Sequence, residues 1–149
     1  MFETPLTVVG NIVNDPKRRP VGDQDVMTFR VASNSRRRGA DGNWEHGNSL
    51  FVTVSCWGRL VTGVGASLRK GSAVIVVGHV HNREYEDRDG IRRSTLEMRA
   101  TSVGPDLSRC IARVEKIVST GAEAPASLTS STSPADATLA TTDADDGGR

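Results

Sequence analysis

The sequence predicts an all-β fold of five strands, with one short helix between the third and fourth strands and a disordered C-terminal tail. Three observations support this prediction. Apolar and polar residues alternate with a period of two in five separate stretches. A further stretch, residues 60–70, has apolar residues at helical spacing instead. Residues 119–149 consist mainly of Ala, Ser, Thr, Asp and Pro, a composition that cannot form an apolar core.

Charge is distributed unevenly along the chain of 149 residues. Residues 1–118 carry 18 Lys and Arg against 13 Asp and Glu, a net charge of +5, whereas residues 119–149 carry −4. A basic body with an acidic tail predicts a polyanion-binding domain attached to a solvated segment. The sequence shows neither an apolar run of membrane-spanning length nor a signal-peptide pattern, so we expect a cytoplasmic protein.

The first two strands are separated by a polar segment. Alternation predicts a strand over residues 6–12, interrupted by Gly10, and glycine permits the close backbone approach that a curling sheet needs. We expect residues 17–23 to form a polar connection. The second strand is expected over residues 26–34, with Arg30 on its polar outer face. Its inward residues are Met27, Phe29 and Val31.

Residues 36–47 form a connection that is too long and too rich in glycine for a tight hairpin, so we expect a mobile flap. Arg36, Arg37 and Arg38 supply positive charge for phosphates, and Trp44 offers an aromatic ring. The alternative is a solvated run of charge with Trp44 folded against the barrel. The combination of arginine and tryptophan favours nucleic acid over this alternative.

Residues 49–59 predict a third strand with two different faces. One face is an apolar row suited to a small core: Leu50, Val52, Val54 and Cys56. The other face is polar, with Thr53 and Ser55, but has Phe51 and Trp57 near its ends. Rings spaced along a polar strand suit stacking on nucleobases. A subunit interface or an overlying loop would use such rings equally well.

The remaining elements are a short helix and two strands. The helix over residues 60–70 has a narrow apolar stripe, and Gly71 is expected to be its C-cap. The strand over residues 73–85 starts with a run that is apolar on both faces, which predicts that each face is buried or paired. It continues with one polar face that ends in an aromatic residue: His79, His81, Arg83 and Tyr85. After a turn at Asp89-Gly90, the fifth strand points Leu96, Met98 and Ala100 inward.

This order of elements is that of the OB-fold, a five-stranded barrel that binds oligonucleotides and oligosaccharides. We expect this barrel to occupy residues 1–104. Catalysis is not expected, because the histidines and cysteines form no paired nucleophile and base. Neither Cys56 nor Cys110 has a metal-ligand spacing, so no metal site and no cofactor are expected.

Several short motifs resemble the bacterial single-stranded DNA-binding protein family in order and spacing across residues 4–104. They are Val8-Val9-Gly10-Asn11-Ile12, Asp15-Pro16, Phe51, Trp57-Gly58-Arg59-Leu60, Leu68-Arg69-Lys70-Gly71-Ser72, Val76-Val77-Gly78 and Tyr85. The resemblance implies an OB-fold that binds single-stranded DNA without strong sequence preference. It also implies a homo-oligomer, usually a tetramer, that serves replication, recombination or repair.

The resemblance implies stacking roles for Phe51, Trp57 and Tyr85. Many members have a further aromatic residue where this chain has Arg36, and Trp44 is a candidate substitute. Arginines and a histidine on the same strands and loops complete the predicted nucleic-acid site: Arg30, Arg36, Arg37, Arg38, Arg59, His81 and Arg83. The alternative function is an OB-fold module that recognises a protein or an oligosaccharide, which a failure to bind oligonucleotides at low salt would indicate.

The C-terminal part departs further from the family pattern. Residues 105–118 fit either an amphipathic helix or an extra strand, and some family members use such a segment to clasp a neighbouring subunit. The family's acidic tail usually closes with a hydrophobic tip that docks on replication and repair enzymes. This chain ends Asp-Asp-Gly-Gly-Arg at residues 145–149. That ending suggests a paralogue and weakens the expectation that its tail recruits such enzymes.

Overall fold

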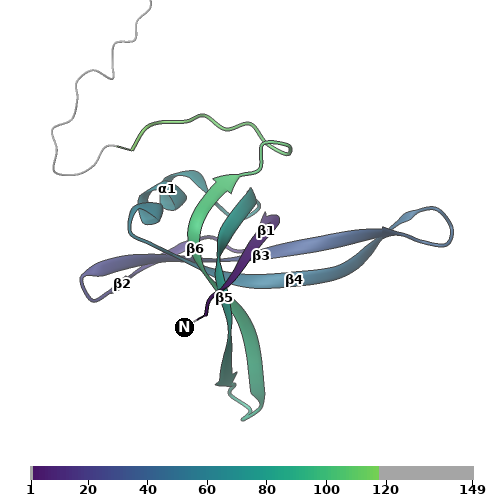
Figure 1. Ribbon diagram of the computed structural model, residues 1–149, viewed down its shortest axis with the longest axis horizontal. Helices are drawn as coiled ribbons and strands as arrows, with labels where there is room; N and C mark the ends of the chain where they lie inside the picture. The colour runs from purple at the N-terminus through teal and green to yellow at the C-terminus, as the bar shows by residue number, and fades with distance from the viewer. Residues whose placement is uncertain (1, 118–149) are drawn as a thin grey trace, which may run out of the picture. The chain divides into compact units, whose positions relative to one another are not determined.

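The computed structural model describes residues 2–117, which contain six strands and one helix (Figure 1). In chain order these are β1 (Thr4–Ile12), β2 (Lys17–Val21), β3 (Gln24–Arg38), β4 (Trp44–Trp57), α1 (Arg59–Ser67), β5 (Ala73–Glu86) and β6 (Arg92–Pro105). No helix within residues 2–117 is long and apolar enough to cross a membrane. The predictions for the acidic tail, residues 119–149, lie outside the described residues.

Five strands close into a ring of backbone pairings. β1 pairs with β5 along its length and with β3 at its end, and the ring continues from β3 through β4 and β6 back to β5. Of these pairings only β4–β6 is parallel. β1 and β3 come so close at the junction that a Cβ on Gly10 would collide with the carbonyl oxygen of Ala32. The close approach predicted at Gly10 is therefore confirmed, and the fold is the predicted OB-fold.

The core lies inside this ring, as the alternation along the strands predicts. It consists of Val8, Ile12, Met27, Phe29, Val31, Val52, Val54, Cys56, Val61, Val64, Val74, Val76, Met98 and Ala100. One prediction of burial was wrong. Leu50 is 41% exposed, because β4 continues from the barrel into a hairpin at this point. The apolar run at the start of β5 is buried on one face within this chain. Ile75 and Val77 on its outer face are each 37% exposed, because the core covers only the inner face.

α1 is shorter than the predicted helix over residues 60–70. It ends early because Leu68 has extended backbone (φ −115°, ψ 148°). Gly71, predicted as the C-cap, instead lies in the following turn with φ +93°, and its N–H donates to the last carbonyl oxygen of β1 over 2.7 Å. The predicted apolar stripe is confirmed, since Val61 and Val64 are buried against the core.

The sixth strand, β2, lies where a polar connection was predicted. It pairs with the first part of β3 from Lys17↔Thr28 to Val21↔Gln24 and forms the edge of the sheet. Its residues are all exposed, so backbone pairing rather than apolar burial holds it in place.

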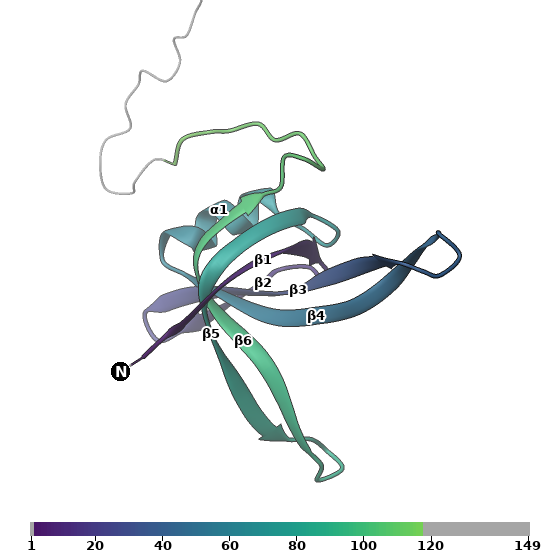
Figure 2. The same ribbon diagram turned by 45° about the vertical axis from the view of Figure 1, so that its right-hand side comes forward.

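The predicted flap over residues 36–47 is mostly a β-hairpin. β3 and β4 remain paired out to Arg38↔Trp44, and only residues 39–43 form the turn. The prediction failed because long polar strands carry no apolar alternation at their ends. The β3–β4 and β5–β6 hairpins extend from the barrel in different directions (Figure 2).

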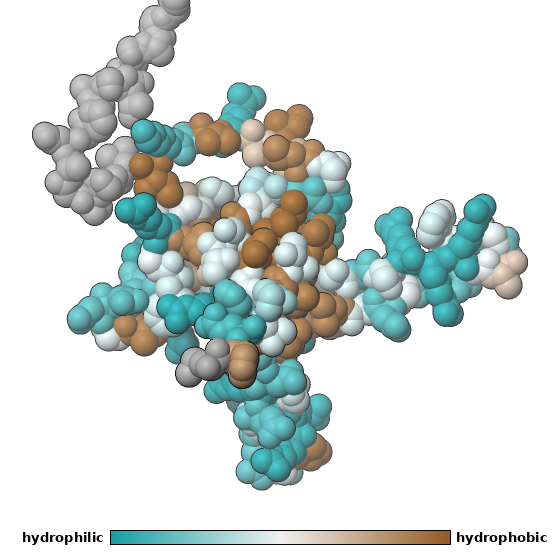
Figure 3. All heavy atoms as spheres, in the orientation of Figure 1, coloured by the Kyte–Doolittle hydropathy of each residue, from teal (hydrophilic) through white to brown (hydrophobic). Residues whose placement is uncertain are grey.

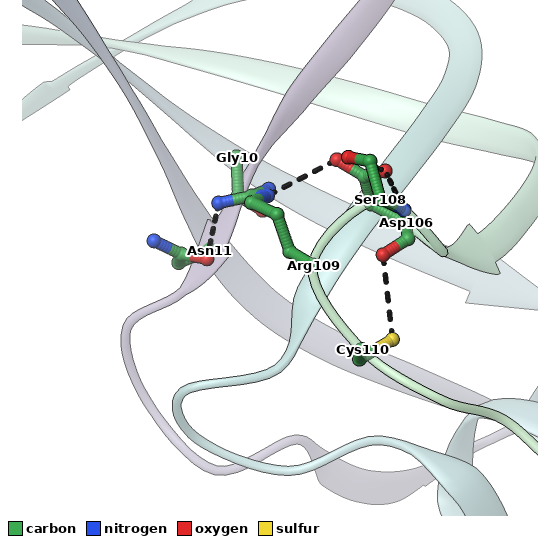
Figure 4. A network of polar contacts seen from close by, with 6 residues as sticks. All are labelled: Gly10, Asn11, Asp106, Ser108, Arg109 and Cys110. Atoms are coloured by element: carbon green, nitrogen blue, oxygen red, sulfur yellow. Dashed lines mark hydrogen bonds and ion pairs between the residues drawn. The ribbon is translucent and has the colours of Figure 1, made fainter.

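The chain beyond β6 turns back onto β1. The Arg109 guanidinium donates to the carbonyl oxygen of Gly10 (2.9 Å), to the side-chain oxygen of Asn11 (3.0 Å) and to Asp106 (3.1 Å), as Figure 4 shows. Residues 110–117 form neither helix nor strand. Over the described part of residues 105–118, the structure therefore shows neither of the two predicted alternatives beyond the end of β6.

Candidate nucleic-acid interface

Side chains that point away from the core line up in rows across the sheet, because paired residues project to the same face. One row crosses β3, β4, β6 and β5. Arg30 pairs with Thr53, Thr53 with Glu97, and Glu97 with His81. The row therefore brings together two predicted site residues, Arg30 and His81, that are far apart in the sequence.

A second row lies beside the first and extends one strand further. It contains Lys17 on β2, Thr28 on β3, Ser55 on β4, Arg99 on β6 and His79 on β5. Lys17, Arg99 and His79 were not predicted as site residues. Lys17 escapes prediction because its strand is fully exposed and has the polar composition of a connection. A signal was available, since Gly22-Asp23 between two extended stretches is typical of a two-residue hairpin turn.

Two aromatic rings on β4 flank the rows. Phe51 lies two residues before Thr53 and is 44% exposed, and the Arg30 guanidinium carbon lies 4.8 Å from its ring centroid. Trp57 lies two residues after Ser55, is half-buried, and has the Arg99 guanidinium carbon 5.9 Å from its ring centroid. Each ring therefore has an arginine over it, and Phe51 keeps a large exposed surface.

The β3–β4 hairpin continues this face. A one-residue register shift separates Asn34↔Ser49 from Arg36↔His46. The shift moves Trp44 onto the face of Phe51, which strict alternation along β4 would not do. Arg36 and Arg38 alternate with Arg30 onto the same face, and Trp44 is 68% exposed.

Arg37 does not belong to this face. It alternates to the opposite side of the hairpin and lies 3.8 Å from Glu45, its cross-strand partner. Arg59 also lies apart from both rows, at the first position of α1. Of the three adjacent arginines predicted to contact phosphate, the structure therefore places two beside Trp44.

The β5–β6 hairpin carries the rest of the predicted site. Arg83 and Tyr85 alternate with His81 along β5, so the polar face predicted for this strand is confirmed. Tyr85 is 43% exposed. Arg83 lies 3.5 Å from Oε2 of Glu97, and His81 Nε2 lies 3.7 Å from Oε1 of the same carboxylate.

The arrangement is suited to binding. Within residues 2–117, no three His, Cys, Asp or Glu side chains gather as metal ligands. Burial raises the pKa of the Cys56 thiol to about 12, which keeps it protonated and unreactive at neutral pH. What the outer face presents is exposed rings and cations, the groups that stack on bases and neutralise phosphates.

The chain is similar to known proteins in sequence and in fold. Residues 4–106 match the model of the single-strand binding protein family. The single-stranded DNA-binding protein of Corynebacterium glutamicum is 44% identical over 117 residues, which cover 76% of this chain and 52% of that protein. The chain therefore spans about half the length of that relative.

Two solved structures are also similar. The second single-stranded DNA-binding protein of Mycobacterium smegmatis is 58% identical, with a TM-score of 0.60, and the match covers 77% of this chain and all of that one. The small single-stranded DNA-binding protein of Streptomyces coelicolor is 30% identical, with a TM-score of 0.68 and 74% of this chain covered, again with all of that chain. The chain belongs to the single-strand binding protein family.

Proposed function

We propose that the protein binds single-stranded DNA without strong sequence preference and protects or organises it during replication, recombination or repair. The observation that carries this proposal is the continuous outer face of the sheet. Phe51 and Trp57 lie on β4 beside two rows that hold Lys and Arg side chains from β2, β3 and β6. A single strand exposes its bases as well as its phosphates, so rings and cations on one face can contact both.

Family membership and the names of the relatives support the same role. We assign base stacking to Phe51, Trp57, Tyr85 and Trp44, since each ring is exposed or half-buried on the outer face. We assign phosphate contacts to cations of the same face: Lys17, Arg30, Arg36, Arg38, Arg83 and Arg99. Phosphate contacts by Arg37 and Arg59, which the sequence predicts, are not part of this proposal, because Arg37 alternates to the opposite side of the hairpin and Arg59 lies on α1.

Titration of tryptophan fluorescence with oligonucleotides tests the proposal. Trp44 is exposed and Trp57 half-buried, so stacking of bases on either ring should change the emission. We expect single strands of increasing length to bind until the site is filled, and duplex of the same length to bind more weakly. Absence of binding to any oligonucleotide at low salt would contradict the proposal and favour recognition of a protein or an oligosaccharide.

We further propose that the protein is a homo-oligomer, usually a tetramer in this family, held together in part by an apolar strip on β1 and β5. Val9 is 47% exposed, and Ile75, its cross-strand partner, and Val77 are each 37% exposed. Figure 3 shows hydrophobic residues gathered on the barrel, while both hairpins are mostly hydrophilic. The segment after β6 adds exposed apolar side chains that could clasp a neighbouring subunit. They are Leu107, which is 66% exposed, Ile111 and Val114.

Light scattering tests the oligomer. The parent protein should have the mass of an oligomer at micromolar concentration, and Ile75→Asp should lower that mass, because it places a charge in the apolar contact. Val13→Asp is the matched control, since Val13 is equally exposed at 37% but lies outside the strip. A monomeric parent, or equal effects of both substitutions, would contradict this part of the proposal.

A further inference from the structure

Glu97 is an acidic side chain in the middle of a face that carries several arginines, and it lies further from the edge of that face than Glu3, which contacts His79. It lies between Thr53 and His81 in the first row. A carboxylate repels phosphate, so its position does not help to bind the backbone of DNA. Its side chain is 23% exposed, and its oxygens lie 3.5 Å from Arg83 and 3.7 Å from His81. The first contact is a long hydrogen bond donated by Arg83 to one oxygen, and the second is beyond hydrogen-bond distance from the other oxygen, so both oxygens keep acceptor capacity for a ligand.

Glu97 is also placed to reach a base on Phe51. Phe51 lies two residues before Thr53, which pairs with Arg30 on one side and with Glu97 on the other. Strand spacing and rise per residue give a diagonal Cα separation of about 8 Å between Phe51 and Glu97, within reach of a long side chain and a stacked base. The ring therefore has the Arg30 guanidinium over it, reaching from β3, and a carboxylate on its β6 side.

We propose that Glu97 accepts hydrogen bonds from the base that stacks on Phe51 and so makes the site prefer guanine over thymine. This inference rests on the proposed function. When Arg30 binds the phosphate of a nucleotide whose base stacks on Phe51, the edge of that base points away from Arg30 and toward Glu97. Guanine offers two adjacent donors, N1–H and the N2 amino group, which match the two oxygens of a carboxylate. Thymine offers one donor, N3–H, with a carbonyl oxygen on each side of it. These two oxygens and a carboxylate repel each other.

The competing explanation is that Glu97 only positions Arg83 and His81. In that case its charge would affect all single strands alike, because phosphate contacts do not depend on the base. The two explanations differ in one quantity, the ratio of the affinities for two base compositions. This ratio cancels any general gain in affinity that comes from removing a negative charge.

The test measures dissociation constants for two single strands of equal length, one of alternating thymine and guanine and one of thymine alone. Glu97→Gln keeps the shape of the side chain but removes its charge and one acceptor. Glu84→Gln is the matched control, because Glu84 also lies near an arginine, 3.6 Å from Arg92, but alternates to the face opposite Tyr85.

We expect the parent to favour the guanine-containing strand. Glu97→Gln should reduce that preference about fivefold, the lower end for a paired contact between a side chain and a base, and Glu84→Gln should leave it unchanged. An unchanged preference in Glu97→Gln, or equal reductions in both variants, would overturn the inference. A parent that binds both strands equally would overturn only this inference, whereas a parent that binds neither would overturn the proposed function.

Discussion

At the scale of single residues, the direction of a side chain decides what it can bind. Arg36, Arg37 and Arg38 are adjacent and look equivalent in the sequence. In the hairpin, Arg36 and Arg38 share a face with Trp44, whereas Arg37 points to the opposite face beside Glu45. Strand alternation thus divides one run of charge into two groups with different surroundings.

This division predicts different salt dependence for the three arginines. Each phosphate neutralised on a single strand contributes about 0.7 to the slope of log affinity against log salt concentration. Replacing Arg36 and Arg38 together by Ser should therefore flatten the slope by up to about 1.4. Arg37→Ser should leave it nearly unchanged. Titrations at several salt concentrations measure both, and an equal effect of the single Arg37 change would show that the hairpin faces are assigned wrongly.

Single positions show where prediction from sequence succeeds. Val52, Val54 and Cys56 are buried as predicted, because alternation fixes which side of a strand faces the core. The face of Trp44 could not be predicted. β4 has one extra residue at the register shift, and this residue moves the side chains that precede it to the opposite face. Leu50 fits the apolar pattern but is exposed, because nothing in the pattern marks where the barrel ends.

At the scale of elements, β2 brings charge to the interface. Lys17 and Arg19 alternate onto the outer face. Arg19 pairs with Val26, which in turn pairs with Trp57, so Arg19 and Trp57 lie in one row across the sheet. Arg18 points to the other face and forms an ion pair with Asp25 over 2.5 Å. The strand therefore presents two cations beside the second aromatic ring and keeps the third away from it.

Substitutions on β2 should separate these roles. Replacing Lys17 and Arg19 by Ser should weaken binding of single strands and flatten the salt slope by about 0.7 for each phosphate that the variant no longer neutralises. Arg18→Ser is the matched control and should have little effect on the slope. Circular dichroism should show that the strands remain intact. If the Lys17 and Arg19 variant keeps the slope of the parent, β2 lies outside the bound strand's path.

The turn after β6 should respond to acid. Hydrogen bonds from the Ser108 side chain and backbone, and then from Arg109, hold the pKa of Asp106 below its ordinary value of 3.8. A carboxylate with a lowered pKa stabilises the folded turn above its unfolded pKa, and this stabilisation is lost as the pH falls through the lowered value.

Hydrogen exchange of the amides in residues 106–109 measures this effect. Corrected for the intrinsic pH dependence of exchange, protection should fall as the pH drops below 3.8, because protonated Asp106 no longer accepts charge-assisted hydrogen bonds. Asp106→Asn should show weaker protection already at neutral pH and no further decrease in acid. Protection in the parent that is independent of pH would contradict a role for the carboxylate.

Elements with a clear apolar pattern were predicted from the sequence, and elements without one were not. The five barrel strands were predicted because each has one apolar face toward the core. β2 and the outer part of the β3–β4 hairpin were not predicted, because exposed strands are held by backbone pairing and carry no such pattern. The helix was predicted too long because Leu68 fits the helical stripe but is already extended.

At the scale of the whole molecule, ring closure assembles the interface. The rows combine residues from positions 17 to 99, and their order follows from the parallel β4–β6 pairing, which no local pattern predicts. The barrel itself could be predicted, because the order of strands and helix is restricted to few folds. The domain boundaries at 104 and 118 and the disorder of the acidic tail remain predictions from the sequence.

The central claim is that one face of this barrel holds single-stranded DNA by stacking, and the affinities of ring variants test it most directly. Phe51→Ala and Trp57→Ala should each weaken binding by about 5- to 150-fold, equivalent to about 1–3 kcal/mol per stacked base, while the proteins remain folded. Phe2→Ala, which removes a fully exposed ring outside the rows, should bind like the parent. Unchanged affinity in both folded ring variants would contradict the account.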